Sequence, residues 1–170
     1  MTRTIFKYFI DYEKEEIWLN QMASIGLAMT HFVLGFYTFE DCIPGEYIYR
    51  LELLKNYPGN IESQRYIRFM EENGVEAIAT WYCWVYFRKK AEDGSFDIYS
   101  DIDSRITHYK RISIFMFCMM ISQYCFAVSQ ILTFTFLCIP FLFLGTILFL
   151  YWNSLRIKIN ILKNEKKLRD

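Results

Sequence analysis

The stretch ISIFMFCMMISQYCFAVSQILTFTFLCIPFLFLGTILFLYWNSL, residues 112–155, carries no charged side chain. A helix needs about 20 apolar residues to cross the hydrocarbon core of a bilayer, so this stretch is long enough for two crossings. A soluble domain within a chain of 170 residues could not enclose two such helices. The sequence therefore predicts a transmembrane hairpin, with helices at 112–132 and 134–155.

Polar residues cluster between Ser129 and Thr135, which favours a turn there. Pro140 then lies near the start of the second helix, where its missing N–H costs least. A turn earlier in the chain would instead make Pro140 kink that helix. Tyr151 and Trp152, near the far end of the second helix, are typical of a membrane interface.

Basic residues flank the hairpin at both ends, and the connecting turn has none. The flanking set is Arg105, Lys110, Arg111, Arg156, Lys158, Lys163, Lys166, Lys167 and Arg169. The positive-inside rule places both termini in the cytoplasm, so we expect a multi-pass protein of the cell membrane. The tail at 156–170 has 6 basic and 2 acidic residues, giving 6 − 2 = +4. It either lies on anionic lipid headgroups or is an ordinary cytoplasmic end, and both interpretations stay open.

Two polar pairs repeat along the first apolar span. Ser122 and Ser129 are seven residues apart, as are Gln123 and Gln130, so each pair falls on one helical stripe. Such side chains are best satisfied against another helix. We expect them to pack within the hairpin or across a homodimer. A polar pathway for a substrate is the weaker alternative, because the stretch holds no charged residue.

The preceding residues, 1–93, have the pattern of an α+β domain. Strands and helices are expected in the order strand, helix, strand, strand, helix, strand, at 4–10, 11–25, 27–40, 47–53, 60–73 and 76–89. The strand at 27–40 is either straight or bent at Gly35. Asp11 and Asn60 are suitable N-caps, and Gly26 and Gly74 are suitable helix-ending glycines.

The two expected helices share a sequence pattern. Residues of similar type recur in order and spacing: Trp18, Leu19 and Met22, then Tyr66, Ile67 and Met70. This recurrence indicates a duplicated strand–helix–strand unit, which matches a ferredoxin-like βαββαβ fold. The residues after this domain, 94–111, carry apolar side chains on one side of a helix. We expect an amphipathic linker helix that runs into the first membrane span and either lies on the membrane or packs against the soluble domain.

Five segments together resemble a known family: KYFID at 7–11, EEIWLN at 15–20, PGEYIYR at 44–50, YFRKK at 86–90 and YSDI at 99–102. The chain resembles an uncharacterised family of Gram-positive bacterial membrane proteins, the domain of unknown function 2812. Members are often encoded beside a PadR-like transcriptional regulator. The resemblance therefore implies a regulatory or signalling setting, and it supplies no catalytic residues to carry over.

The acidic residues Asp11, Glu13, Glu15 and Glu16 could suggest acid–base chemistry or a metal site. Carboxylates at the positive end of a helix have a simpler electrostatic reason to be there, and we favour it. No histidine cluster, nucleophile motif or phosphate-binding glycine loop is present. The five cysteines are scattered, which is typical of reduced, buried thiols. We expect no enzyme activity, no catalytic residue, no metal and no cofactor.

Aromatic residues in the last expected strand raise the question of nucleic acid binding. Residues 1–111 hold 13 basic and 17 acidic side chains, giving 13 − 17 = −4, so the basic footprint that nucleic acid requires is missing. The uncovered face of the sheet is expected to carry Ile48, Arg50, Tyr82, Trp84 and Tyr86, or their neighbours if the register differs by one. This face would either bind a partner or be covered by the linker helix.

These observations favour a membrane-anchored regulatory or sensing module whose cytoplasmic domain binds a protein partner. The family resemblance suggests a PadR-like transcriptional regulator as that partner. The alternative is an accessory subunit of a transporter or other membrane complex.

Overall fold

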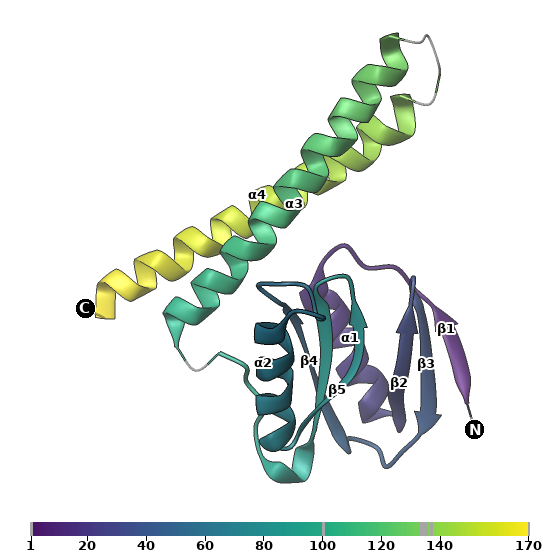
Figure 1. The fold of residues 1–170 in the computed structure, drawn as a ribbon, viewed down its shortest axis with the longest axis vertical. Helices are drawn as coiled ribbons and strands as arrows, with labels where there is room; N and C mark the ends of the chain where they lie inside the picture. The colour runs from purple at the N-terminus through teal and green to yellow at the C-terminus, as the bar shows by residue number, and fades with distance from the viewer. Residues whose placement is uncertain (1, 100, 133–135, 137, 170) are drawn as a thin grey trace. The chain divides into compact units, whose positions relative to one another are not determined.

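The computed structural model describes residues 2–99, 101–132, 136 and 138–169 (Figure 1). The chain divides into two compact units, Met1–Ile98 and Tyr99–Asp170. The first unit mixes strands and helices and is called the soluble unit below. The second consists of two long helices and is called the helical unit.

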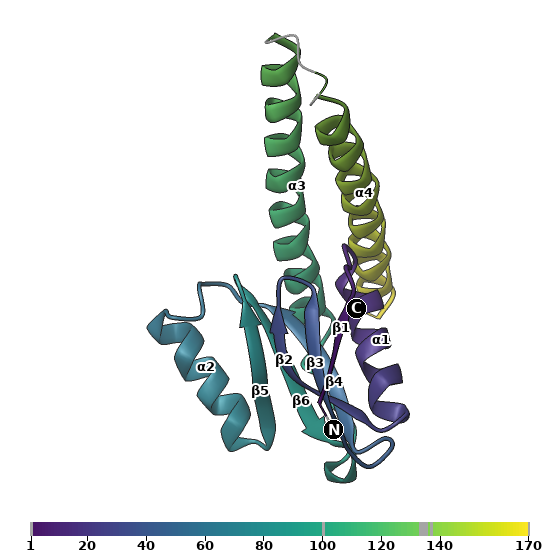
Figure 2. The same cartoon turned by 90° about the vertical axis from the view of Figure 1, so that its right-hand side faces the viewer.

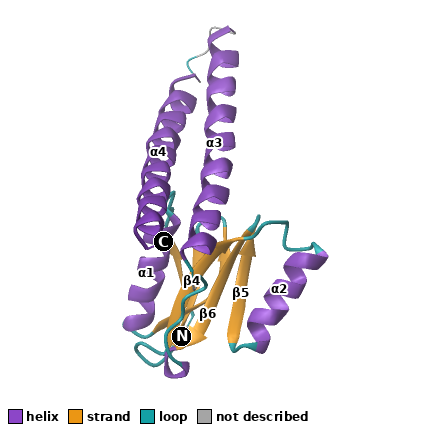
Figure 3. Ribbon diagram, turned by 90° about the vertical axis from the view of Figure 1, so that its left-hand side faces the viewer, coloured by secondary structure: helices purple, strands orange, loops and turns teal. Residues whose placement is uncertain are grey.

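The soluble unit contains the same β-α-β-β arrangement twice (Figure 2), and Figure 3 shows the three strands of the second copy side by side. The first copy comprises β1 (Arg3–Phe6), α1 (Tyr12–Ser24), β2 (Leu27–Val33) and β3 (Phe36–Asp41). The second comprises β4 (Tyr47–Leu53), α2 (Ile61–Glu72), β5 (Val75–Trp81) and β6 (Trp84–Lys90), followed by a 3₁₀ turn at Ala91–Asp93. The expected single strands at 27–40 and 76–89 are wrong, because each folds back into a hairpin. The ferredoxin-like order is not confirmed, since the chain forms two separate sheets.

Each copy builds a three-stranded antiparallel sheet with its last strand in the centre, in the orders β1-β3-β2 and β4-β6-β5. The register shifts after Met29 in β2 and after Ala77 in β5. Leu34 and Tyr82, in the two hairpin turns, both have a positive φ. Met29 and Ala77 are 48 residues apart, and so are Leu34 and Tyr82. The recurring residues of the two helices have the same spacing. The duplication indicated by the helices therefore extends through the hairpins.

Local sequence sets the ends of both helices in the soluble unit. The side chains of Asp11 and Asn60 accept hydrogen bonds from the backbone N–H two residues on, at 3.1 and 2.9 Å. Gly26 and Gly74 follow the helices with φ of 87° and 78°. The predicted caps and helix-ending glycines are confirmed.

Two cores cover the two faces of the second sheet. The first core joins both copies and contains Leu19, Ala23, Leu27, Met29, Phe32, Tyr37, Phe39, Tyr49, Leu51 and Tyr86. The second core lies under α2 and contains Leu54, Met70, Val75, Val85, Phe87 and Phe96. Side chains alternate between the faces of a strand, so neighbouring residues of β6 enter different cores. Of the two alternatives left open for the second face of the sheet, coverage by the chain itself is the one observed, by α2 and the segment with Phe96 and Ile98 rather than by a linker helix.

The helical unit pairs α3 (Ile102–Leu132) with α4 (Cys138–Arg169) in antiparallel fashion (Figures 1 and 2). Buried residues recur every seven positions, as in a coiled coil: Ile106, Ser113, Met120 and Ala127 on α3, and Leu148, Leu155 and Leu162 on α4. Both helices are long and apolar enough to cross a membrane. Pro140 lies in the first turn of α4, while residues 133–135 of the expected turn fall outside the described chain.

The expected linker and tail are both parts of this helix pair. The linker helix begins at Ile102 rather than at 94, and its apolar side packs on α4 through Ile106, Ile159 and Leu162. The expected tail at 156–170 continues α4 as far as Arg169. Lys166 of that segment forms an ion pair with Asp103 at 2.6 Å. Both segments join the helix pair because the apolar seven-residue pattern continues beyond the charge-free stretch.

Candidate functional site

A buried carboxyl group joins the two copies of the soluble unit. Glu15 lies in the first turn of α1 and is only 8% exposed. Its Oε1 accepts hydrogen bonds from the hydroxyls of Tyr37, on β3, and Tyr86, on β6, both at 2.6 Å. The Phe32 ring lies beside both tyrosine rings, with centroids 4.7 and 4.8 Å away. One carboxyl oxygen thus connects a helix and a strand of the first copy to a strand of the second.

Burial decides the electrostatics of this cluster. It raises the pKa of Glu15 above the ordinary value, while the hydrogen bonds from Tyr37 and Tyr86 lower that pKa in part. Burial and the neighbouring carboxyl raise the pKa of each tyrosine, so both hydroxyls stay protonated and remain donors. The cluster can hold a proton or a negative charge in an aromatic core. The predicted role of Glu15 at the positive end of the helix misses this long-range contact.

The next polar residues of α1 cover the open edge of β4. Glu16 accepts a hydrogen bond from the N–H of Leu51 at 3.0 Å. Asn20 donates to the carbonyl of Tyr49 at 3.0 Å and accepts from its N–H at 2.9 Å. Glu16 also forms an ion pair with Arg50 at 3.3 Å. Side chains therefore take the place of a further strand and satisfy an edge that would otherwise invite pairing.

An exposed apolar surface lies at the turns of the two equivalent hairpins. Leu34 and Tyr82 occupy these turns with φ of 49° and 56°, and each is 64% exposed. Residues beside the turns are also exposed and apolar. Together they form the hairpin patch, made of Phe6, Val33, Leu34, Phe36, Trp81 and Tyr82.

Ring contacts connect the parts of the hairpin patch. Phe6 and Phe36 have ring centroids 4.9 Å apart. Phe32 contacts Trp81 with centroids 6.2 Å apart, which brings the end of β2 next to the end of β5. The arrowheads of β2 and β5 accordingly lie at the same end of the unit (Figure 2). The patch therefore gathers exposed residues of both copies at this end of the unit.

The structure separates the five residues expected to bind a partner. Tyr82 belongs to the hairpin patch, whereas Tyr86 is buried in the first core. Trp84 is half-buried, with its ring 5.3 Å from that of Tyr12. Ile48 packs against the second core, and Arg50 is held by the carboxylates of α1 and the segment after β6. They do not share a face.

The rest of the patch was missed because it depends on unpredicted turns. Leu34-Gly35 was expected inside a single strand with at most a bend at Gly35, and neighbouring side chains of a strand alternate between faces. Gly35 has φ of 84°, and positive φ at both central residues is what a type I′ hairpin turn requires. The Leu-Gly pair was the available signal, but leucine is not a usual turn residue.

Four polar residues were expected to pack within the membrane. Gln123 and Gln130 are half-buried and continue the stripe of the buried Met116, as packing between helices requires. Ser122 donates to the carbonyl of Met119 within its own helix at 2.7 Å. Ser129 is exposed.

The remaining side chains that could take part in chemistry are possible metal ligands, the histidine of α3 and the cysteines. Within the described residues, no three His, Cys, Asp or Glu side chains are grouped so as to hold a metal ion. His108 lies 2.6 Å from the hydroxyl of Tyr99 through its Nδ1. All five cysteines are free, but Cys118 and Cys125 are exposed on α3, so the expectation that every thiol is buried is wrong.

Comparison with known proteins gave one match. A family model described as a protein of unknown function, DUF2812, matches residues 11–121, about two thirds of the chain. A search of curated proteins and a search of solved structures each found no match. The matched region begins at the N-cap of α1 and ends within α3. Because the match covers more than half of the chain, this protein belongs to the DUF2812 family.

Proposed function

We propose that this protein is a membrane-anchored regulatory or sensing module whose soluble unit binds a cytoplasmic protein through the hairpin patch. The observation that carries the proposal is the pair Leu34 and Tyr82. A left-handed conformation costs a residue other than glycine about 1–2 kcal/mol. Both side chains are mostly exposed, so burial in the core does not offset that cost. Strained residues that present an apolar surface are typical of binding sites.

The helical unit supports the membrane part of the proposal. Its two helices can cross a bilayer, and the basic residues at both ends favour a cytoplasmic location for both termini. The soluble unit would then be held close to the inner leaflet. A PadR-like regulator is the partner that the family resemblance suggests, and its capture would connect the membrane to transcription.

The alternative function, an accessory subunit of a membrane complex, was motivated by the polar stripe of α3. Gln123 and Gln130 are half-buried on the stripe of Met116, so packing within the hairpin accounts for them. Ser122 is likewise satisfied inside its own helix. The polar stripe therefore does not require a further membrane partner, and we favour the sensing module.

Co-purification of the full chain with the neighbouring regulator from detergent extracts tests this function. The informative variant is Leu34→Asn with Tyr82→Asn, because asparagine tolerates positive φ and removes the apolar surface. The control is Ile25→Asn with Ile43→Asn. These residues are 67% and 71% exposed and lie near the start of β2 and the end of β3, at the other end of the hairpin from Leu34.

The patch variant should reduce capture at least about tenfold, since a central apolar contact contributes about 2 kcal/mol or more to binding. The control should bind like the wild type. Equal capture by the patch variant and the wild type would contradict the proposal. So would capture by the helical unit alone, since the patch lies on the soluble unit.

A further inference from the structure

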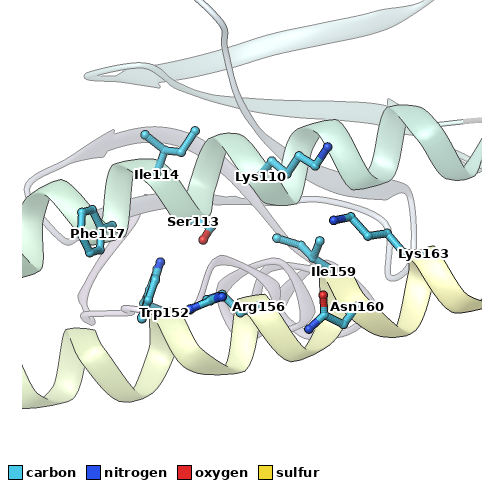
Figure 4. A pocket seen from close by; sticks show the side chains of 9 residues that line it. All are labelled: Lys110, Ser113, Ile114, Phe117, Trp152, Arg156, Ile159, Asn160 and Lys163. Atoms are coloured by element: carbon cyan, nitrogen blue, oxygen red, sulfur yellow. The ribbon is translucent and has the colours of Figure 1, made fainter.

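A groove runs between α3 and α4 where the apolar part of the hairpin meets its charged base (Figure 4). Its volume is about 410 Å³, and all its lining residues belong to the helical unit. One end is apolar and aromatic. Phe117 and Trp152 lie there with ring centroids 5.4 Å apart, and Ile114 is next to them on α3.

The other end of the groove is basic. Lys110 approaches from α3, and Arg156 and Lys163 approach from α4 (Figure 4). Ser113 and Asn160 add uncharged hydrogen-bonding groups. None of the described residues that line the groove is acidic. Three like charges around one cavity repel each other, and a bound anion would relieve that repulsion.

Arg156 is already held in place for such an anion. Its guanidinium lies over the ring of Trp152, 4.9 Å from the centroid. Stacking on an aromatic ring limits the side chain's freedom, so less entropy is lost when the guanidinium binds a ligand. Its planar donors match two oxygens of a phosphate group.

The order of charged and apolar groups along the groove matches the order of headgroup and acyl chain in a membrane lipid. Lys110 and Phe117 are seven residues apart on one helix, which corresponds to about 10 Å at 1.5 Å per residue. A headgroup layer is about 5–8 Å thick on each side of the hydrocarbon core. With the charge-free stretch in the membrane, the basic end would lie among headgroups and the aromatic end at the start of the acyl chains.

We infer that this groove binds one anionic phospholipid. The phosphate lies against Lys110, Arg156 and Lys163, and the first part of the acyl chains lies on Phe117 and Trp152. A free phosphate ion would use the basic end but would leave the adjoining aromatic end without a role. A zwitterionic lipid would leave the excess positive charge uncompensated, so the groove should prefer a net negative headgroup. The inference rests on the membrane insertion proposed above.

Native mass spectrometry of the full chain in detergent tests the inference. Phosphatidylglycerol and phosphatidylcholine with the same acyl chains are titrated against the wild type and against Arg156→Gln with Lys163→Gln. The control is Lys167→Gln, which removes an exposed charge of the same helix outside the groove. Flotation with neutral phosphatidylcholine vesicles checks separately that every variant inserts into a membrane.

The wild type should retain phosphatidylglycerol more strongly than phosphatidylcholine. The groove variant should lower phosphatidylglycerol affinity at least about tenfold, since each basic residue contributes several-fold. The Lys167→Gln control should bind nearly as the wild type does. Inorganic phosphate at the lipid concentration should not displace the lipid.

Three results would overturn the inference while leaving the proposed function intact, provided that the chain floats with neutral vesicles. They are equal retention of the two lipids, an equal loss in Lys167→Gln and the groove variant, and displacement by inorganic phosphate. Failure to float with neutral vesicles would instead overturn both proposals, because the hairpin would not be inserted.

Discussion

Replacing Tyr86 with phenylalanine tests the carboxyl cluster of the first core. The change removes one hydroxyl that donates to Glu15 at 2.6 Å and keeps the ring that contacts Phe32. A hydrogen bond to a charged group contributes about 1.5–3 kcal/mol to stability, and a neutral one about 0.5–1.5 kcal/mol. Tyr86→Phe should therefore lower the free energy of unfolding by about 2 kcal/mol when Glu15 is ionised. The loss should be about 1 kcal/mol when Glu15 is protonated.

The direction of the pH dependence follows from the raised pKa. Burial lifts the pKa of Glu15 above the ordinary value of 4.5, so the folded chain holds this proton more tightly than the unfolded chain. The stability that Glu15 provides is thus complete below pH 4.5 and falls as the pH rises through the folded pKa. Removing a donor raises that pKa further. The loss in Tyr86→Phe should therefore be greater at high pH than at low pH.

Urea unfolding of the full chain in detergent, followed by tryptophan fluorescence at pH 4.5 and 7.5, measures both effects. Trp18 lies 4.8 Å from Tyr37 between ring centroids, so its emission reports on this core. Tyr57→Phe is the matched control, because Tyr57 is 65% exposed and its change should be near zero. A loss that is the same at both pH values, or one no greater than that of the control, would refute the reasoning.

Three further substitutions test other parts of the structure. Asn20→Ala should cost about 1–3 kcal/mol in urea unfolding, because it leaves two backbone groups of Tyr49 without their partner; an unchanged midpoint would exclude this edge role. Gly145→Leu should lower the thermal unfolding midpoint of the helical unit by circular dichroism, since even a Cβ would lie 3.0 Å from the Tyr124 ring; an equal or higher midpoint would contradict this packing. Leu34→Asn should raise the free energy of unfolding by about 1 kcal/mol by relieving a left-handed leucine, and a loss of stability would show that the leucine is not strained.

Features that depend on neighbouring residues could be predicted from the sequence. The absence of charge over 112–155 indicated the two apolar helices, since crossing a membrane requires only a long apolar segment. Asp11 and Asn60 marked two helix starts, and Gly26 and Gly74 marked the ends, because caps act within a few residues. The residue pattern shared by the two helices indicated a duplication, because such a pattern can be compared along the sequence without knowing any tertiary contact.

Features that depend on distant residues were decided only by the tertiary structure. Glu15 is 22 and 71 residues from the two tyrosines that bind it, and its sequence neighbours indicate only a helix start. The hairpin turns at Leu34 and Tyr82 use residues that normally continue a strand, so packing of the two copies overrides local preference. Asp103 and Lys166 meet across 63 residues because two helices pair along one apolar stripe. Interactions between sequence neighbours thus set the helices and their ends. Packing between residues far apart in the sequence decided that the polar Glu15 is buried and that the apolar Leu34 is exposed.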